Sequence, residues 1–301
     1  MFVIIDTANP ESFKGVRAPE FPPKGVTFHP HGMYLDSKRN LIYVISHSYM
    51  NGGERIEVFE VTTLPRGMGI RHKRSLILPE YLMGVSNDLI VLDEGKTIFV
   101  TKFLPIYDPP TGRDTSTCAN YERWIKTILG GYTEVYKCEV GDDLDDLQCS
   151  VFLTKGDEYN GIEWDEKRST IYVADVLKSE VRAVKIDKET KEIKKITDYN
   201  VKHHPDNLVL IGDMLYAGVF VSRSMHDEAL KAISKEGRDF TSCKHPGGGV
   251  KLNVRTGQVE EVVIQDILFG STLLLPVDSG NKKRAFIGSW GKHPMGIRDL
   301  E

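Results

Sequence analysis

The sequence predicts an all-β fold, and two observations support this prediction. The first is a pattern of strands and turns: short runs that are rich in β-branched and aromatic residues, with alternating polarity, recur along the whole chain. Clusters of Asp, Gly, Asn and Ser stand between them, which is the composition of hairpin turns. The strands expected in chain order are LIYVIS (41–46), RIEVFEV (55–61), DLIVLD (88–93), TIFVTKF (97–103), EVYKCEV (134–140), TIYVAD (170–175), EVRAVKID (180–187), LVLIG (208–212), MLYAGVF (214–220), VKLNV (250–254), VEEVV (259–263), TLLLPV (272–277) and RAFIGSW (284–290).

The second observation is repetition. A polar head residue is followed by an apolar alternating stretch, a turn and a second β-rich run, and the gaps between heads are 56, 73, 46 and 65 residues. This spacing suits a four-stranded propeller blade of about 40–50 residues, with insertions in some units. If the units are equivalent blades around one axis, the heads meet in one polar cluster. The head residues are His31, Asn87, Asn160, Asp206 with Asn207, and Ser271.

The bulk properties favour one domain over residues 1–301. The chain has no linker-like composition shift, and its 301 residues can bury a substantial core. The formal charge of −4 gives no reason to expect nucleic acid, and KIDKETKEIKK (185–195) is interpreted as a solvated hairpin rather than a phosphate-binding stripe. No apolar run is long enough to span a bilayer, and MFVIID lacks the basic start of a signal peptide.

Two insertions are expected to be helical. Apolar residues between 119 and 129 follow a helical period, and 226–239 is a weaker amphipathic candidate. Either segment would serve as a substrate lid or simply cap exposed strand edges. The four cysteines match no zinc-ligand spacing. Cys138 and Cys149 flank an acidic turn and could face each other across a hairpin. Reduced thiols are the default expectation, and a disulfide is the alternative.

The head residues carry the chemistry. The side chains of Asn87, Asn160 and Asp206 offer only oxygen ligands, which suit a hard cation such as Ca²⁺. Zinc would want histidine or thiolate ligands. His31 is itself a head, and His47 follows the strand 41–46 closely enough to lie beside it. Two adjacent imidazoles can take a proton from water and relay it, while a cation polarises a carbonyl. These parts together indicate hydrolysis of an ester or lactone.

Aromatic residues recur at a second set of equivalent positions. These residues are predicted to fill the core: Tyr43, Phe99, Tyr172 and Tyr216. Other aromatic residues near the heads, which would pack in blades or line a substrate pocket, are Tyr159, Trp164 and Trp290.

The chain resembles the serum paraoxonase/arylesterase family of calcium-dependent lactonases. The matching pieces extend over essentially the whole chain, and they are FHPHGM (28–33), VISHS (44–48), the stretch from RHK to NDLIVL (71–92), YNGIEWD (159–165), HPDNLVL (204–210) and FGSTLLL (269–275). The resemblance implies a six-bladed β-propeller that hydrolyses small lactones and aryl esters. It also implies two Ca²⁺ sites. The implied ligands of a catalytic calcium are Asn87, Asn160, Asp206 and Asn207. A structural calcium would take Asp88 and the backbone carbonyl of Met33, and His31 with His47 would be the base dyad.

The chain also departs from the family pattern. The family's adjacent Glu-Asp pair, one carboxylate for each calcium, is not found among the 30 residues before His31. We therefore expect one or more strands of one blade to be missing and each calcium site to lack one carboxylate, which weakens metal binding. Members of the family are often secreted or membrane-associated, but no N-glycosylation site is present, so the compartment and any peripheral membrane or lipoprotein association stay open.

Two other functions remain open at this point. The chain could be a catalytically impaired propeller that acts as a ligand- or protein-binding scaffold, because fold does not fix function. It could also be a sugar-lactone hydrolase of the gluconolactonase type, although the pairing of His31 with His47 argues against that class.

Overall fold

The computed structural model describes residues 2–5, 13–64, 67–112, 125, 132–141, 147–221, 247–265, 271–279, 282–289 and 296–300. Regular structure in these ranges is almost entirely antiparallel β-sheet, so the all-β prediction is confirmed. Short 3-10 helices also occur, at η1 (Tyr49–Asn51), η2 (Glu80–Leu82) and η3 (Asp93–Gly95). The chain forms two compact units, Met1–Gly156 and Asp157–Glu301. A single domain over 1–301 therefore stays a prediction.

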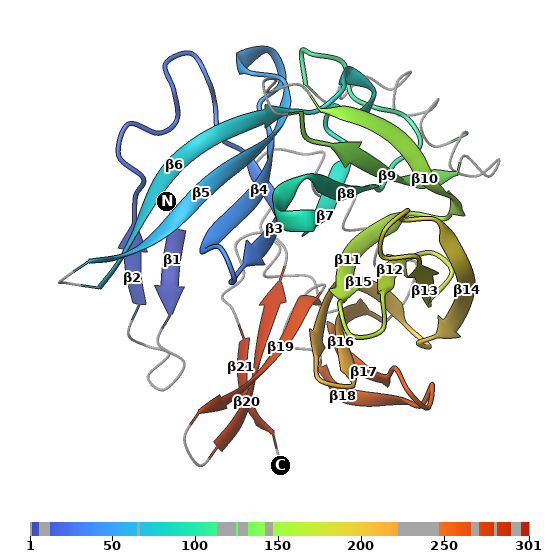
Figure 1. Cartoon of the computed structure of the whole chain (residues 1–301). Coiled ribbons are helices and arrows are strands. Elements are labelled where there is room, and N and C mark those ends of the chain that lie inside the picture. Colours follow the sequence, from blue (N-terminus) through green and yellow to red (C-terminus); the bar gives the residue numbers. More distant parts are fainter. Residues whose placement is uncertain are drawn as a thin grey trace. The chain divides into compact units, whose positions relative to one another are not determined.

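The first unit contains two four-stranded sheets in which consecutive strands pair with one another (Figure 1). One sheet has the order β3-β4-β5-β6 and the other β7-β8-β9-β10, and β1 and β2 form a separate pair. The bounds are β1 (Phe2–Ile5), β2 (Phe13–Val16), β3 (Pro30–Asp36), β4 (Leu41–His47), β5 (Glu54–Leu64), β6 (Gly67–Ile77), β7 (Ser86–Leu92), β8 (Thr97–Lys102), β9 (Thr133–Glu139) and β10 (Gln148–Gly156).

The second unit repeats the same plan. Two further four-stranded sheets have the orders β11-β12-β13-β14 and β15-β16-β17-β18, and a three-stranded sheet has the order β19-β20-β21. The bounds are β11 (Tyr159–Asp165), β12 (Thr170–Asp175), β13 (Glu180–Ile186), β14 (Ile193–Asn200), β15 (His204–Ile211), β16 (Met214–Phe220), β17 (Gly247–Asn253), β18 (Val259–Gln265), β19 (Ser271–Ser279), β20 (Lys282–Ser289) and β21 (Gly296–Leu300).

Successive four-stranded meanders in chain order are the blade arrangement of a β-propeller. The described residues form four such blades, where the sequence analysis expected six. All of the expected strands are present. The main additions are polar fourth strands: β14 reads IKKITDYN, and most of its side chains are exposed. A strand at a sheet edge carries charges instead of an alternating apolar pattern, so periodicity does not reveal it.

Apolar side chains between neighbouring sheets make the core of each unit. Tyr43, Ile56 and Val100 belong to one cluster in the first unit, and Tyr172, Leu208 and Val250 belong to one in the second. The recurring aromatic residues pair with the residue three positions after each head. The pairs are Tyr43 with Tyr34, Phe99 with Ile90, Tyr172 with Glu163 and Tyr216 with Val209. The repeat is therefore structural, and these aromatic residues fill blades as predicted.

The two expected helical insertions, 119–129 and 226–239, lie outside the described residues apart from residue 125, and so does Trp290. None of the helices in the described part of the chain is long and apolar enough to cross a membrane.

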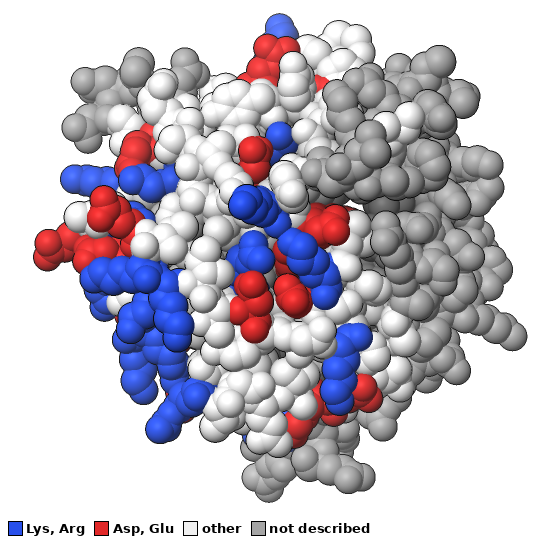
Figure 2. Space-filling model, turned by 90° about the vertical axis from the view of Figure 1, so that its right-hand side faces the viewer, with Lys and Arg blue, Asp and Glu red and all other residues white. Residues whose placement is uncertain are grey.

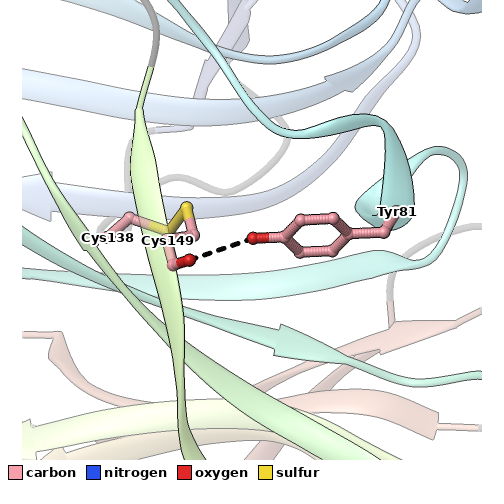
Figure 3. The surroundings of a disulfide bond; sticks show 3 residues. All are labelled: Tyr81, Cys138 and Cys149. Carbon is pink, nitrogen blue, oxygen red and sulfur yellow. Dashed lines mark hydrogen bonds between the residues drawn. A yellow bond between two sulfur atoms is a disulfide. The ribbon is translucent and has the colours of Figure 1, made fainter.

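The hairpin of β9 and β10 carries a disulfide between Cys138 and Cys149, which are direct neighbours in the register (Figure 3). The default expectation of reduced thiols was therefore wrong. Directly opposite positions on two antiparallel strands bring the two side chains within bonding reach. The Tyr81 hydroxyl donates a hydrogen bond to the Cys149 carbonyl at 3.0 Å, which joins η2 to this hairpin.

This disulfide predicts a specific covalent link. Peptide mapping of the unreduced, unfolded protein should recover residues 138 and 149 in one cross-linked fragment. Replacing both with alanine should lower the free energy of unfolding by about 2–3 kcal/mol, because a short loop is released in the unfolded chain. Complete alkylation of both cysteines without reductant would contradict the bond.

Candidate functional site

Each head residue lies at a β-bulge. On the first strand of a sheet, the ladder pairs that flank the head are three residues apart, whereas their partners on the second strand are two apart. The flanking residues are Pro30 and Met33, Ser86 and Leu89, Tyr159 and Ile162, and Pro205 and Leu208. On β19 one extra residue, Thr272, stands between the pairs that begin at Ser271 and Leu273. A bulge frees one residue from the ladder and re-aims its side chain, and bulges are common beside active sites.

A glycine after the head lets neighbouring sheets approach closely within each unit. A Cβ on Gly32 would lie 2.2 Å from the backbone oxygen of Asn87 and 2.7 Å from Asp88 Oδ1. A Cβ on Gly161 would lie 2.5 Å from the backbone oxygen of Asp206. The head of one blade therefore adjoins the head of the next: His31 beside Asn87 in the first unit, and Asn160 beside Asp206 in the second.

The two predicted histidines are in contact. His31 Nδ1 and His47 Nε2 are 2.7 Å apart, and the rings meet edge to face with centroids 5.0 Å apart. His31, on the bulge of β3, is exposed, while His47, at the end of β4, is half-buried. His31 also lies near an apolar ring, since the ring centroids of His31 and Phe103 are 6.0 Å apart. The two histidines are therefore adjacent in the first unit, and their role as a base dyad stays a prediction.

Sequence reasoning missed the residue that orients this pair. Glu54, at the start of β5, is fully buried, and its carboxylate oxygens lie 2.8 and 3.0 Å from His47 Nδ1. The Gly84 backbone N–H donates to the same carboxylate at 3.0 Å, and the Ser86 hydroxyl donates to it as well. A carboxylate buried among donors accepts from all of them.

This carboxylate sets the tautomers of both histidines. Because Glu54 accepts from His47 Nδ1, the proton of neutral His47 is on Nδ1 and its Nε2 is the acceptor. His31 Nδ1 then donates to His47 Nε2, which places the basic lone pair of His31 on its Nε2. The three side chains form a hydrogen-bonded chain from the surface to a buried anion, which is the arrangement that a general base needs.

Two buried carboxylates lie close to this chain. Asp88 is buried on the bulge of β7, where its backbone N–H donates to Thr101 Oγ1 at 3.0 Å. Asp108 is fully buried and accepts from the Tyr49 hydroxyl at 3.1 Å. A Cβ on Gly84 would lie 2.3 Å from Asp108, so this carboxylate packs directly on the loop that binds Glu54. Sequence analysis named Asp88 but not Asp108.

The heads of the second unit present buried oxygen atoms. Asn160 is buried, and its Oδ1 has no hydrogen-bond partner. Asn207 Nδ2 donates to Asp206 Oδ1 at 3.2 Å and to the Thr272 backbone oxygen at 3.0 Å, so the amide and the carboxylate of this head are linked. Among the described residues, Asn160 Oδ1 and Ser271 Oγ are the buried side-chain polar atoms that lack a partner, and both are at heads.

A buried acceptor without a partner is costly, and a bound ion or water is one way to satisfy it. The partnerless Asn160 Oδ1 and the buried carboxylate of Asp206, on the adjoining head, are oxygen groups of the kind that a hard cation takes as ligands. However, across the residues that the structure describes, no group of three or more His, Cys, Asp or Glu side chains is placed to hold a metal. Any cation here would depend on amide and backbone oxygens. Met33 is exposed and paired with Val44, and its assignment to a structural calcium stays a prediction.

Of the aromatic residues expected to pack in blades or line a pocket, Tyr159 is fully buried, and its hydroxyl accepts from Arg182 at 2.5 Å. Burial raises its pKa well above the ordinary tyrosine value. Trp164 is partly buried on β11. Tyr159 is therefore a packing residue with a satisfied hydroxyl rather than a pocket wall.

Comparison with known proteins gives similarity of fold only. No family model matches the chain, and no curated protein matches it. Similar solved structures include a calcium-binding protein, regucalcin, from Agrobacterium tumefaciens, with 10% identity, a TM-score of 0.48 and coverage of 91% of this chain and 90% of that one. A protein of Bacteroides uniformis, provisionally assigned as a 6-phosphogluconolactonase, has 10% identity, a TM-score of 0.45 and coverage of 91% and 86%. Hydrazine synthase of Kuenenia stuttgartiensis has 10% identity, a TM-score of 0.50 and coverage of 90% and 65%.

The close approach at Gly32 predicts a large effect of one methyl group. Gly32→Ala should lower the free energy of unfolding by about 1–3 kcal/mol, because the new Cβ would overlap the backbone of Asn87. Leu35→Ala on the same strand is the control. Leu35 is 58% exposed, so its loss should cost less than about 0.5 kcal/mol. Equal urea midpoints for Gly32→Ala and the parent would show that the heads do not pack as described.

Proposed function

We propose that this chain is a calcium-dependent hydrolase of lactones and aryl esters, built as a six-bladed β-propeller. In this fold β19–β21 would be an incomplete fifth blade and β1–β2 part of a sixth. The observation that carries the proposal is the chain of hydrogen bonds from Glu54 through His47 to His31 at the bulge of β3. A histidine pair oriented by a buried carboxylate, beside polar heads, supports base catalysis more directly than it supports a scaffold.

His31 would act as the general base in this proposal. Its Nε2 removes a proton from water, and the oxygen of that water forms a bond to the carbonyl carbon of the ester or lactone. As His31 becomes an imidazolium, its Nδ1 proton is shared with His47 Nε2, and the Glu54 carboxylate stabilises the resulting positive charge. When the C–O bond to the leaving group breaks, the proton returns from the histidine pair to the leaving alkoxide or phenoxide.

The ligands proposed for a catalytic calcium are Asn87, Asn160, Asp206 and Asn207. The proposed structural calcium takes Asp88 and the Met33 carbonyl. When bound, Ca²⁺ supplies Lewis-acid polarisation of the carbonyl and a counter-charge for the oxyanion. The partnerless Oδ1 of Asn160 and the buried Asp206 carboxylate favour this assignment. Carboxylate ligands are few, so we expect weak affinity.

A second candidate function is a ligand- or protein-binding scaffold with impaired catalysis. The observation in its favour is that the described residues hold no cluster of three or more His, Cys, Asp or Glu placed around a metal. A scaffold of this kind would hydrolyse neither substrate class, and its binding would not depend on His31.

The histidine chain predicts the effect of two substitutions on hydrolysis of phenyl acetate and γ-butyrolactone. His31→Gln should lower kcat by about 10²–10⁴-fold, because the general base is lost. Glu54→Gln should lower kcat by at least about tenfold and shift the pH profile, because His47 loses the acceptor that fixes its tautomer.

The matched control for these variants is His72→Gln. His72 also lies 2.7 Å from a buried carboxylate, that of Glu57, but it has no contact with the dyad. Its kcat should stay within about twofold of the parent. Full activity of His31→Gln with the parent's pH profile would contradict the assignment of His31 as the general base.

Calcium binding predicts a stability effect that does not depend on turnover. The parent's melting temperature should rise with added CaCl₂, by an amount that corresponds to about 2.7 kcal/mol at a hundredfold excess over Kd. Asn160→Ala should abolish most of this rise. Asn200→Ala removes an amide of the same unit that caps the turn at Lys202, so it should retain the rise. A rise that is equal in all three proteins would rule out Asn160 as a ligand.

A further inference from the structure

We propose that the second unit contains a binding site for a small phosphorylated molecule, at the end of the β11–β14 sheet opposite the head bulge. A cavity of about 460 Å³ lies there, and all of its lining residues belong to this unit. On β11 the bulge is at Asn160, near the first ladder pair. The cavity is lined by the turn after the last pair, Asp165 with Thr170, and by side chains along β12, β13 and β14. None of the lining residues belongs to the histidine chain, and the proposal does not depend on the proposed hydrolase function.

Positive charge dominates the cavity wall. Its charged lining residues are Lys167, Arg168, Lys185 and Lys195, and no Asp or Glu side chain is part of the lining. Within the described ranges, none of the three lysines is within ion-pair distance of a carboxylate. Asp187, close in sequence to Lys185, is bound to Lys194 at 2.6 Å instead. Figure 2 shows that Lys and Arg side chains gather in groups on the face that it draws, with Asp and Glu groups between them.

The lysines are placed against each other by the sheet register. Lys185 on β13 is directly opposite Lys195 on β14, and Thr170 on β12 is opposite Lys185 on its other side. Opposite residues of two antiparallel strands have Cβ atoms about 4.5–5.5 Å apart, and like charges in this position destabilise the pair. Two facing lysines without a compensating carboxylate are locally unfavourable. Locally unfavourable arrangements of this kind are expected at functional sites. An anion between the two ammonium groups would remove the repulsion.

The other polar groups of the wall favour phosphate over a planar carboxylate. Arg168 NH1 is bound to Asp165 at 2.6 Å, and NH2 is bound to Asp213, so its bidentate fork is already used inside the protein. The remaining groups that can bind an anion are the lysines, which act as point charges, and the hydroxyl groups of lining residues such as Tyr172 and Tyr199. Burial raises the pKa of Tyr172, so its hydroxyl stays protonated and can donate a hydrogen bond. Several separate donors around a cavity suit the tetrahedral oxygens of a phosphate.

The volume restricts the ligand to a small molecule. Pockets for small ligands span about 300–1,000 Å³, and this cavity is in the lower part of that range. The cavity would take a metabolite-sized compound with one or two phosphate groups.

Calorimetric titration with inorganic pyrophosphate tests the proposal. The parent protein should show saturable binding that weakens as NaCl is raised, because charge drives the association. Lys185→Gln/Lys195→Gln should weaken binding at least about tenfold. The control, Lys24→Gln/Lys202→Gln, removes the same charge from two exposed lysines outside the cavity and should bind within about twofold of the parent.

Folding of the variants is checked by their melting temperatures without ligand. Lys185→Gln/Lys195→Gln should melt at the parent temperature or above it, because the repulsion across β13 and β14 is gone. The proposal is overturned if pyrophosphate does not bind saturably, or if both double variants bind it equally. It is also overturned if succinate, a dicarboxylate probe of similar charge, binds as tightly as pyrophosphate.

Discussion

The repeated bulge at the start of each blade is the constraint on which the candidate chemistry depends. One extra residue on β3, β7, β11, β15 and β19 breaks the ladder at the same point of each sheet. Alternation alone would send every second side chain of these strands into the core. The bulge instead frees one residue of each strand from this alternation. The glycines at 32 and 161 let the next strand approach closely at this point. Polar heads from segments far apart in sequence therefore become neighbours within each unit.

Burial of the Glu54 carboxylate determines how the hydrogen bonds of the histidine pair in the first unit are directed. Glu54 has no exposure to solvent, so its charge must be satisfied by donors from the protein, and these come from His47, Gly84 and Ser86. This requirement fixes a proton on His47 Nδ1, so His47 Nε2 accepts a hydrogen bond from His31 Nδ1. His72 is paired in a similar way with Glu57, but among the described residues its ring neighbours are Phe21 and Phe59 and not a second histidine. The proposed base chemistry therefore depends on the exposed His31 at its bulge, in addition to a buried acid beside a histidine.

Much of the architecture follows from the sequence, because alternation, turn residues and the repeat all depend on local chemistry. The heads and the contact of His31 with His47 were predictable for that reason. Glu54 was not, since a single acidic residue just before RIEVFEV has no periodic signal and its role depends on donors 30 and 32 residues away. The segment 185–195 forms the hairpin expected for it, but its interpretation as a merely solvated hairpin missed the facing of Lys185 and Lys195. That pairing depends on the register, which the sequence does not show.

The proposed base chemistry depends on the direction of the hydrogen bonds between Glu54, His47 and His31, and ¹⁵N NMR of the histidine rings measures this direction. The protein with neutral histidines should show His47 as the Nδ1–H tautomer, with His31 carrying its proton on Nδ1 as well. In Glu54→Gln this preference of His47 should be lost. A parent spectrum in which the His47 proton is on Nε2 would contradict the account, because the buried carboxylate would then not orient the base.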